Sequence, residues 1–295
     1  MLSNSSILIT GGTGSFGSAF VPMTLEKYNP KKIVIYSRDE MKQWEMAKLY
    51  KDYPNIRFFI GDVRDKDRLC RALDGIDYVV HAAATKIVPT AEYNPFECIK
   101  TNVNGAMNLI DACIDKNVKR IVSLSTDKAS SPVNLYGATK LTSDRLFVAG
   151  NSYSGSHETS FSVVRYGNVI NSRGSVAPFF QNLKKNSAKY IPITHKDMTR
   201  FLLSLEQATD LIDWAFDSKH SHGKIAIPKI KALKVTDIAN VLIKSYGLDI
   251  PLKYIGIRRG EKLHEEMISN EEWMRTEEYE NFLITERIIP MQSSK

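Results

Sequence analysis

The sequence contains few cysteines and no long hydrophobic run. Cys70, Cys98 and Cys113 are widely spaced and form no CxxC pair, so we expect neither a disulfide framework nor a metal site. No apolar run reaches the roughly 18 residues that a membrane-spanning helix needs, and the first residues lack the pattern of a secretion signal. We therefore expect a cytoplasmic protein without a membrane span.

A concentrated basic patch is also missing. The 295 residues include 40 lysines and arginines and 33 acidic residues, which gives a formal charge of +7. The basic residues are dispersed among acidic ones, and no basic stripe is interleaved with aromatic residues, so we expect no nucleic-acid partner. A phosphorylated cofactor and an anionic small substrate would use the same excess of positive charge.

Short apolar runs alternate with helical patterns in the first half of the chain. This alternation is typical of strand-helix-strand units and a parallel sheet. The sequence predicts strands at Ser6–Thr10, Lys32–Tyr36, Arg57–Ile60, Tyr78–His81, Arg120–Ser125 and Ser160–Arg165. It predicts helices at Gly14–Lys27, Asp39–Tyr50, Asp65–Leu73, Asn94–Lys116 and Leu135–Ala149.

The alternation becomes irregular after Arg165, with further helices predicted at Leu205–Phe216 and Val235–Tyr246. We predict an α/β fold in which residues 1–167, with a return near residues 200–228, form a Rossmann-like doubly wound parallel sheet. Residues 168–295 mainly form a smaller α/β lobe that binds the substrate. Because the carboxyl ends of parallel strands open on one edge, ligands are expected to bind there.

A glycine-rich turn, Gly11–Gly17, joins the first predicted strand to the first predicted helix. Gly11 suits backbone angles closed to other residues, Gly14 permits close approach of a pyrophosphate, and Gly17 permits close packing of helix and strand. An ordinary tight turn is the alternative. We expect dinucleotide binding by Gly11, Thr13, Gly14, Ser15, Phe16 and Gly17.

The second strand ends without the acidic residue that usually holds the ribose hydroxyls of NAD. The chain instead has Ser37 and Arg38, and an arginine suits the 2′-phosphate of NADP. A solvated arginine beside a helix cap at Asp39 is the alternative. After the third strand, Asp62 and Val63 are placed for the adenine edge, although Asp62 would equally suit the cap of the next helix.

Tyr136 and Lys140 lie one helical turn apart, on the same face of a predicted helix. A lysine ammonium favours the phenolate and can hold the nicotinamide ribose, so the tyrosine can exchange a proton with a sugar hydroxyl as hydride leaves. By itself this spacing usually means a surface helix. Its position downstream of the glycine-rich turn, after the fifth strand, favours a catalytic pair.

Thr126, Asp127 and Lys128 follow the fifth strand at the predicted ligand edge. A desolvated lysine near cationic neighbours can act as a base near neutral pH, and a sheltered aspartate can hold a proton. The alternative is a turn in which the two side chains pair with each other. We expect the base to remove a carbon-bound proton and the acid to protonate a departing hydroxyl.

Nine blocks of the sequence carry a family resemblance. They are Gly11–Gly17, Tyr36–Glu40, Gly61–Asp65, His81–Ala84, Ala91–Pro95, Ser125–Ala129, Tyr136–Lys140, Arg165–Val169 and Gly260–Glu265. Together they resemble the extended short-chain dehydrogenase/reductase family and, within it, the inverting UDP-N-acetylglucosamine 4,6-dehydratases of pseudaminic acid and related pathways. The resemblance extends from Ile7 to about Ile284.

The resemblance implies a reaction cycle on a UDP-sugar with a tightly bound, recycled NADP. Tyr136 takes the C4 hydroxyl proton as hydride passes to NADP, Lys128 removes the C5 proton, and Asp127 assists loss of the C6 hydroxyl as water. Hydride then returns to C6, and reprotonation at C5 from the opposite face inverts that carbon. Lys128 argues for inversion, because retaining hexose dehydratases typically have Thr-Asp-Glu at this block.

The resemblance also implies further binding residues. Ala82 and Lys86 would contact the cofactor. The substrate would be bound by Lys86, Asn168, Arg173, Gly174, Ser175, Val176, Arg200, Arg258 and Glu261. Each of the charged residues alone would equally suit a surface position or a salt bridge. Two departures from the family pattern are Ile87, where histidine is usual, and Arg259, where proline is common.

Other functions remain open from the sequence. A retaining dehydratase or a C4 epimerase on a related sugar nucleotide is the nearest alternative. A non-catalytic NADP-sensing protein on the same fold is a further one, although such proteins commonly lose the Tyr-Lys pair. The resemblance implies a homo-oligomer, either a dimer or a hexamer.

Overall fold

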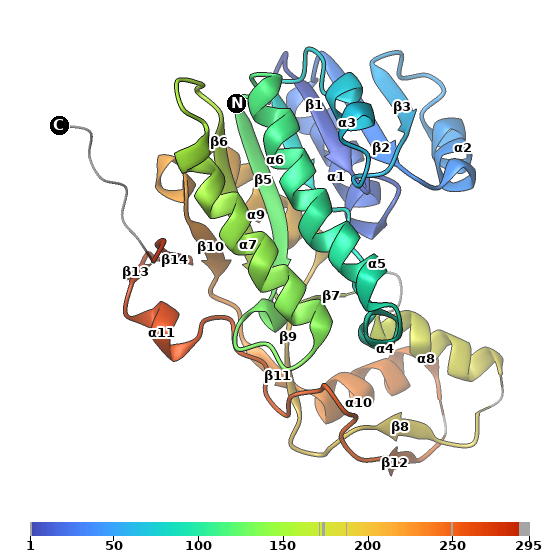
Figure 1. Ribbon diagram of the computed structural model, residues 1–295. Helices are drawn as coiled ribbons and strands as arrows, with labels where there is room; N and C mark the ends of the chain where they lie inside the picture. The colour runs from blue at the N-terminus through green and yellow to red at the C-terminus, as the bar shows by residue number, and fades with distance from the viewer. Residues whose placement is uncertain (1, 171, 173–174, 187, 249, 289–295) are drawn as a thin grey trace.

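A large twisted sheet runs through the protein in the computed structural model, which describes residues 2–170, 172, 175–186, 188–248 and 250–288 (Figure 1). Within these residues the sheet has nine strands in the order β13-β14-β10-β6-β5-β4-β1-β2-β3. The strands from β10 to β3 pair in parallel, while β14 and β13 are antiparallel additions. Their bounds are β1 Ser6–Thr10, β2 Lys32–Ser37, β3 Ile56–Ile60, β4 Tyr78–His81, β5 Arg120–Thr126, β6 Ser160–Tyr166, β10 Ile225–Pro228, β13 Thr276–Glu278 and β14 Phe282–Thr285.

Helices cover both faces of this sheet. On one face α1 (Ser15–Tyr28) packs against α9 (Leu205–Asp217), and on the other α6 (Gly105–Asp115) packs between α3 (Lys66–Ala72) and α7 (Leu135–Tyr153) (Figure 1). The central strands are therefore buried on both sides, which explains their continuous apolar sequences. The strand order reverses between β1 and β4, and this reversal is the point where doubly wound sheets bind ligands.

The six predicted strands are confirmed, each within one residue at either end. The predicted helix near Asn94–Lys116 is confirmed as helical backbone from Pro95 to Asp115, but a π turn inside it was not predicted. The structure has α5 (Pro95–Ile99), one π-helical turn at Lys100–Asn104, and then α6. The side chain of Asn102 in the π turn accepts a hydrogen bond from the Thr85 backbone N–H and donates to the Thr85 carbonyl, at 2.8 and 2.9 Å. The turn thereby ties this helix to the loop after β4, a tertiary contact that helical periodicity does not encode.

The remaining elements complete the framework and form the smaller lobe. They are α2 Glu40–Leu49, α4 Val88–Tyr93, α8 Val176–Lys185, α10 Val235–Tyr246, α11 Asn270–Trp273, β7 Asn168–Val169, β8 Ile191–Ile193, β9 Thr199–Leu203, β11 Ala232–Lys234 and β12 Leu252–Tyr254. The lobe gathers α8, α10, β8 and β12 at one end of the molecule (Figure 1). It has its own apolar core of Phe180, Ile191, Ile193 and Ala239.

The C-terminal half returns to the large sheet more often than the sequence suggests. The elements α9 and β10 lie within the predicted return near residues 200–228, but β13 and β14 also join the sheet edge. The predicted α/β class and doubly wound sheet are confirmed, while the division at residue 167 stays a prediction. Among the described residues, no helix is both long and apolar enough to span a membrane.

Candidate active site

A cavity of about 840 Å³ opens at the carboxyl ends of β1, β2, β4 and β5 and continues to the smaller lobe. It brings together most of the residues that the sequence predicts for the site. On the cofactor side these are Gly11, Thr13, Gly14, Ser15, Phe16, Ser37, Arg38, Asp62, Val63, Ala82 and Lys86. Toward the lobe they are Thr126, Lys128, Tyr136, Lys140, Asn168, Ser175, Val176, Arg200, Arg258 and Glu261.

The glycine-rich turn has the geometry of a phosphate cradle. Gly11 has φ +65°, and a Cβ atom there would lie 2.9 Å from the backbone of Ala83. Gly17 does not line the cavity but packs helix α1 against the turn, since a Cβ atom would lie 1.9 Å from the Gly12 carbonyl oxygen. Helix α1 begins at Ser15 with no acidic residue in its first turn, so its positive end is free of competing carboxylates. These features fit a bound pyrophosphate.

The end of β2 carries the groups that would meet a 2′-phosphate. Asp39 caps helix α2 by accepting a hydrogen bond from the Lys42 backbone N–H at 3.0 Å, as the alternative interpretation of this residue held. The exposed Arg38 side chain extends to Asp62, with 3.4 Å between Nη1 and Oδ2. Lys42, which the sequence reading missed, also lines the cavity. Arg38 and Lys42 therefore line this end of the site together with Asp62 and Asp39, the carboxylates with which they form ion pairs.

Asp62 lines the cavity and does not cap the following helix, so that alternative is wrong. The cap of α3 is Asp65, whose side chain accepts a hydrogen bond from the Arg68 backbone N–H. Asp62 instead accepts hydrogen bonds from the Arg64 guanidinium at 2.7 and 2.9 Å, and these bonds lower its pKa against the effect of burial.

Tyr136 and Lys140 lie in the first turns of α7, a helix capped by Asn134. The Asn134 side chain accepts a hydrogen bond from the Gly137 backbone N–H and donates one to the Gly260 carbonyl, both at 2.8 Å. Burial raises the pKa of the Tyr136 phenol, while its hydrogen bond with Thr126 lowers it. Burial also lowers the pKa of the Lys140 ammonium. Tyr136 and Lys140 therefore do not lie on a solvated surface helix, which was the alternative.

Gly137 allows α7 to approach the Thr126–Lys128 block. A Cβ atom at Gly137 would lie 2.2 Å from the Lys128 carbonyl oxygen, so any larger residue would push the two segments apart. This contact fixes the distance between the Tyr136 pair and Lys128. The glycine between Tyr136 and Ala138 was part of a recognised block, but its packing role was not predicted.

The Thr126–Lys128 block spans the end of β5 and the start of a 3₁₀ turn at Asp127–Ala129, which Thr126 caps. Asp127 is fully buried and accepts hydrogen bonds at Oδ1 from Thr126 Oγ1 at 2.9 Å and from Lys128 Nζ at 3.0 Å. Thr126 and Lys128 line the cavity, but Asp127 lies behind them. The two charged side chains thus pair with each other, as the alternative held, and do so at the cavity wall.

The surroundings of Lys128 differ from the expected cationic ones. Its Nζ atom donates to Asn168 Oδ1 at 3.3 Å and lies 3.8 Å from Oε1 of Glu265, a buried residue that lines the cavity. Glu265 belongs to the recognised Gly260–Glu265 block but was not predicted as a site residue. Lys128 therefore lies between two carboxylates, Asp127 and Glu265, and the expectation of cationic neighbours is wrong.

The predicted diphosphate residues lie on the lobe side of the cavity. Arg200 donates to the Thr199, Leu263 and Lys262 carbonyls at 2.7 to 3.2 Å, so much of its guanidinium holds the C-terminal segment in place. Arg258 and Glu261 form an ion pair at 2.8 Å. Burial lowers the pKa of Lys86. Arg173 and Gly174 lie outside the described residues.

Known sequences similar to this chain include sugar-nucleotide enzymes. A family model described as polysaccharide biosynthesis protein matches residues 7–287. The chain is 55% identical over 282 residues to a Campylobacter jejuni protein named UDP-N-acetylglucosamine 4,6-dehydratase (inverting), an alignment that covers 96% of the chain and 83% of the relative. It is 42% identical over 281 residues to a Rickettsia felis protein named UDP-glucose 4-epimerase, with 94% and 82% covered.

Solved structures share the fold. The structure of Pen from Bacillus thuringiensis superposes with a TM-score of 0.92 at 39% identity and covers 97% of this chain and 90% of that chain. A dTDP-glucose 4,6-dehydratase from Streptomyces venezuelae, solved with NAD bound, has a TM-score of 0.78 at 23% identity and covers 89% and 88%. The chain therefore belongs to the polysaccharide biosynthesis protein family, and the predicted resemblance to inverting UDP-N-acetylglucosamine 4,6-dehydratases is confirmed.

Proposed function

We propose that this protein is an NADP-dependent lyase that converts UDP-N-acetylglucosamine into a UDP-2-acetamido-2,6-dideoxy-4-keto-hexose with inversion at C5. One observation carries the proposal. A single cavity is lined by a phosphate-type glycine turn, the Tyr136–Lys140 pair and Lys128, with Asp127 directly behind Lys128. Hydride transfer and elimination both need to act on one sugar, and this arrangement brings the groups for both steps to one space.

The cofactor end supports NADP over NAD. Arg38 and Lys42 line the cavity where β2 ends, and the carboxylate of Asp39 is engaged by the N-terminus of α2. A 2′-phosphate would gain charge-assisted hydrogen bonds from these cations, whereas position 37, near which NAD-preferring sites usually carry an acidic residue, is a serine. When bound, NADP would accept the hydride from C4 of the sugar and return it at C6.

Tyr136 would act on the C4 hydroxyl. Its phenolate, which the nearby Lys140 ammonium stabilises, accepts the hydroxyl proton and becomes the phenol as hydride leaves C4. The resulting C4 ketone acidifies the proton on C5.

Asp127 and Lys128 would carry out the elimination as a pair that shares one proton. The pair is an ammonium and a carboxylate in one form, and transfer of the proton across the 3.0 Å contact gives a neutral amine and a neutral acid. The amine of Lys128 then takes the C5 proton, while Asp127 gives its proton to the departing C6 hydroxyl through the Thr126 hydroxyl, which lines the cavity and lies 2.9 Å from Asp127 Oδ1. The products are water, an ammonium and a carboxylate, so protons and charges balance.

The proposal is tested by incubating the purified protein with UDP-N-acetylglucosamine, with and without added NADP, and analysing the nucleotide sugars by mass spectrometry. We expect a product that has lost one water, and we expect Tyr136→Phe to form none. If no dehydrated product appears under either condition, the proposal is wrong. A C4 epimer alone would favour the second candidate, an epimerase, which the Rickettsia relative supports.

The assembly is a separate part of the proposal. The resemblance supports a homo-oligomer, either a dimer or a hexamer, that works in the cytoplasm. Light scattering coupled to size-exclusion chromatography measures the molar mass in solution. A mass equal to one chain of 33.3 kDa would contradict the oligomer.

A further inference from the structure

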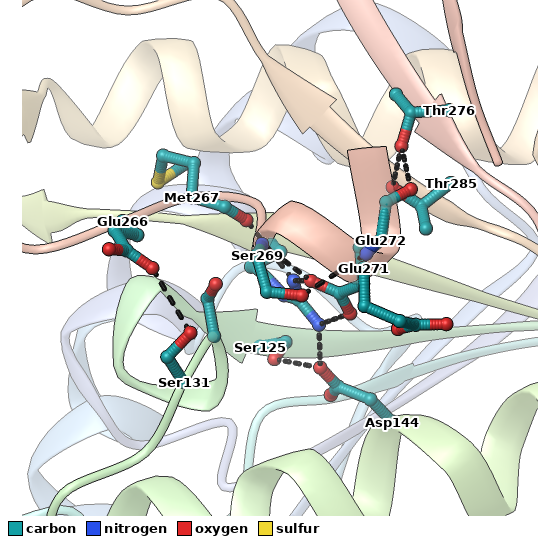
Figure 2. A network of polar contacts seen from close by, with 12 residues as sticks. Ser125, Ser131, Asp144, Glu266, Met267, Ser269, Glu271, Glu272, Thr276 and Thr285 are labelled. Carbon is teal, nitrogen blue, oxygen red and sulfur yellow. Dashed lines mark hydrogen bonds and ion pairs between the residues drawn. The ribbon is translucent and has the colours of Figure 1, made fainter. Parts of the chain in front are cut away.

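A buried network of charged side chains lies beside α7, the helix that carries Tyr136 and Lys140 (Figure 2). Its centre is Arg165 on β6, whose side chain is fully buried. Arg165 donates to Asp144 Oδ2 at 3.2 Å and to both carboxylate oxygens of Glu272 at 2.8 and 3.0 Å. It also donates to the Met267 carbonyl at 3.1 Å. None of these residues has a role in the proposed reaction.

Asp144 connects this network to the active site. It lies on α7 four residues after Lys140, so the two side chains lie on the same face of the helix, one turn apart. Both are buried, at 0% and 3% exposure. Ser125, which lines the cavity, donates to Asp144 Oδ2 at 2.7 Å, as Figure 2 shows. The carboxylate is therefore separated from the cavity by one small side chain.

The cluster holds charges of both signs. Arg165 and Lys140, with Arg145 at its edge, are the cations, and Asp144 and Glu272 are the carboxylates. The second Asp144 oxygen, Oδ1, is buried and has no hydrogen-bond partner among the described residues. A buried carboxylate oxygen without such a partner is costly unless a nearby positive charge stabilises it. Besides Arg165, the cation facing Asp144 is Lys140, which makes the lysine part of the network.

We propose that Asp144 is a positioning residue that keeps Lys140 in its ammonium form and in place beside Tyr136, and that Arg165 and Glu272 hold the Asp144 carboxylate for this task. The inference rests on the proposed function, since that function gives Lys140 its role beside Tyr136 and the cofactor ribose. It also gives a function to the C-terminal segment, since Glu272 belongs to α11, far along the chain from α7.

The electrostatic balance at Lys140 agrees with this role. Burial lowers the pKa of Lys140, and the Asp144 carboxylate opposes that shift. Burial raises the pKa of Asp144, while Arg165, Lys140 and the Ser125 hydrogen bond oppose it. The other titratable groups beside Lys140 and Asp144 are His81 and Tyr136, whose pKa values they shift in turn. Removal of the Asp144 charge would leave burial unopposed at Lys140.

The test compares Asp144→Asn with Glu272→Gln. Each variant removes one carboxylate from the same buried network and leaves Arg165 one carboxylate partner. Glu272 accepts two hydrogen bonds from Arg165 and one from the Ser269 N–H, whereas Asp144 accepts one from Arg165, so Glu272→Gln is the structurally harsher control. Only Asp144 lies one turn from Lys140. The readouts are the Kd for NADP, measured without sugar across pH, and the pH profile of kcat/KM for dehydration. Thermal unfolding checks that both variants are folded.

In wild type we expect NADP binding to weaken at alkaline pH as Lys140 loses its proton. We expect Asp144→Asn to move this alkaline limb to lower pH by about one unit and Glu272→Gln to leave it in place. An unchanged limb in Asp144→Asn, or an equal shift in both variants, would overturn the inference. Because NADP binding is measured without sugar, this outcome is separate from the proposed function, which fails if wild type forms no dehydrated product.

Discussion

The two halves of the active site are built in different ways. The hydride-transfer half takes Tyr136 and Lys140 from one helix and its phosphate cradle from one turn, Gly11–Gly17. The elimination half is assembled from three distant segments, because Lys128 lies beside Asp127, Asn168 and Glu265. Each part of the first half is local in sequence, whereas the second half depends on how Asn168 and Glu265 are brought to Lys128. The elimination half should therefore be more sensitive to changes in the C-terminal segments than the hydride-transfer half.

The largest expected effect comes from replacing Lys128, which separates the two halves chemically. In Lys128→Ala we expect dehydration to fall about 10³-fold, since a positioned general base contributes about that factor. Oxidation at C4 should continue, so reduced nicotinamide should accumulate when sugar is added. Absorbance of the reduced cofactor and product analysis measure the two steps. Tyr136→Phe is the comparison and should lose both, whereas full turnover in Lys128→Ala would remove the lysine from the mechanism.

Breaking the buried network should have the next largest effect, on stability. Arg165→Met leaves the carboxylates of Asp144 and Glu272 buried without their shared cation, a loss that costs about 3–5 kcal/mol of unfolding free energy. Denaturant unfolding of wild type and variant measures the difference. Arg145→Met removes a half-buried neighbour of Glu272 that lies 3.8 Å away, and it serves as the milder control. A loss of unfolding free energy under 1 kcal/mol in Arg165→Met would mean that the network does not stabilise the fold.

A smaller effect should test the apolar environment on the hydride-transfer side. Burial lowers the pKa of His81 to about 3 from the ordinary 6.5, and Thr10 Oγ1 lies 2.8 Å from its Nδ1 atom. Between these pH values the unfolded chain binds a proton that the folded protein does not. Stability should therefore fall as pH decreases below 6.5, by about 1.4 kcal/mol per pH unit from this residue. His81→Gln cannot ionise and should show a shallower decline in denaturant unfolding, and an unchanged slope would contradict the assignment.

The smallest expected effect is on the choice of cofactor. Arg38→Ala removes one exposed cation from the end of β2, and we expect the Kd for NADP to rise about tenfold. The Kd for NAD serves as the internal control and should stay constant, because NAD has no 2′-phosphate. Isothermal titration with both cofactors measures the ratio. Equal weakening of both would show that Arg38 supports the site in another way.

The same comparison explains what the sequence could predict. The strands, the glycine turn and the Tyr136–Lys140 spacing depend on residues close together in the chain, and all lie where expected. Lys128 was found from its place after β5, but its carboxylate neighbours were not. The segment that carries Glu265 is held beside Lys128 by contacts such as those of Lys262 with the Ser130 carbonyl and of Asn134 with the Gly260 carbonyl, between segments more than a hundred residues apart. The residue pattern within either segment does not predict that the two segments will lie against each other.

The helix predicted at residues 94–116 also shows the effect of contacts between distant segments. Its apolar periodicity predicts a continuous helix, yet side-chain bonds of Asn102 to Thr85 and to Thr139 accompany a π turn. The partners lie in a loop and in another helix. Residues such as Asn102, whose side chains form hydrogen bonds with distant segments, can depart from the backbone geometry that local sequence predicts. In this protein Asn102 does so near the active site.

The central claim is that one cavity joins a reversible hydride transfer to an elimination by Lys128. The most direct measurement is the NMR spectrum of product formed from UDP-N-acetylglucosamine in deuterated water. The account predicts a C6 methyl group, deuterium at C5 and the inverted C5 configuration. A product without a C6 methyl group, or one that keeps the gluco arrangement at C5, would contradict it.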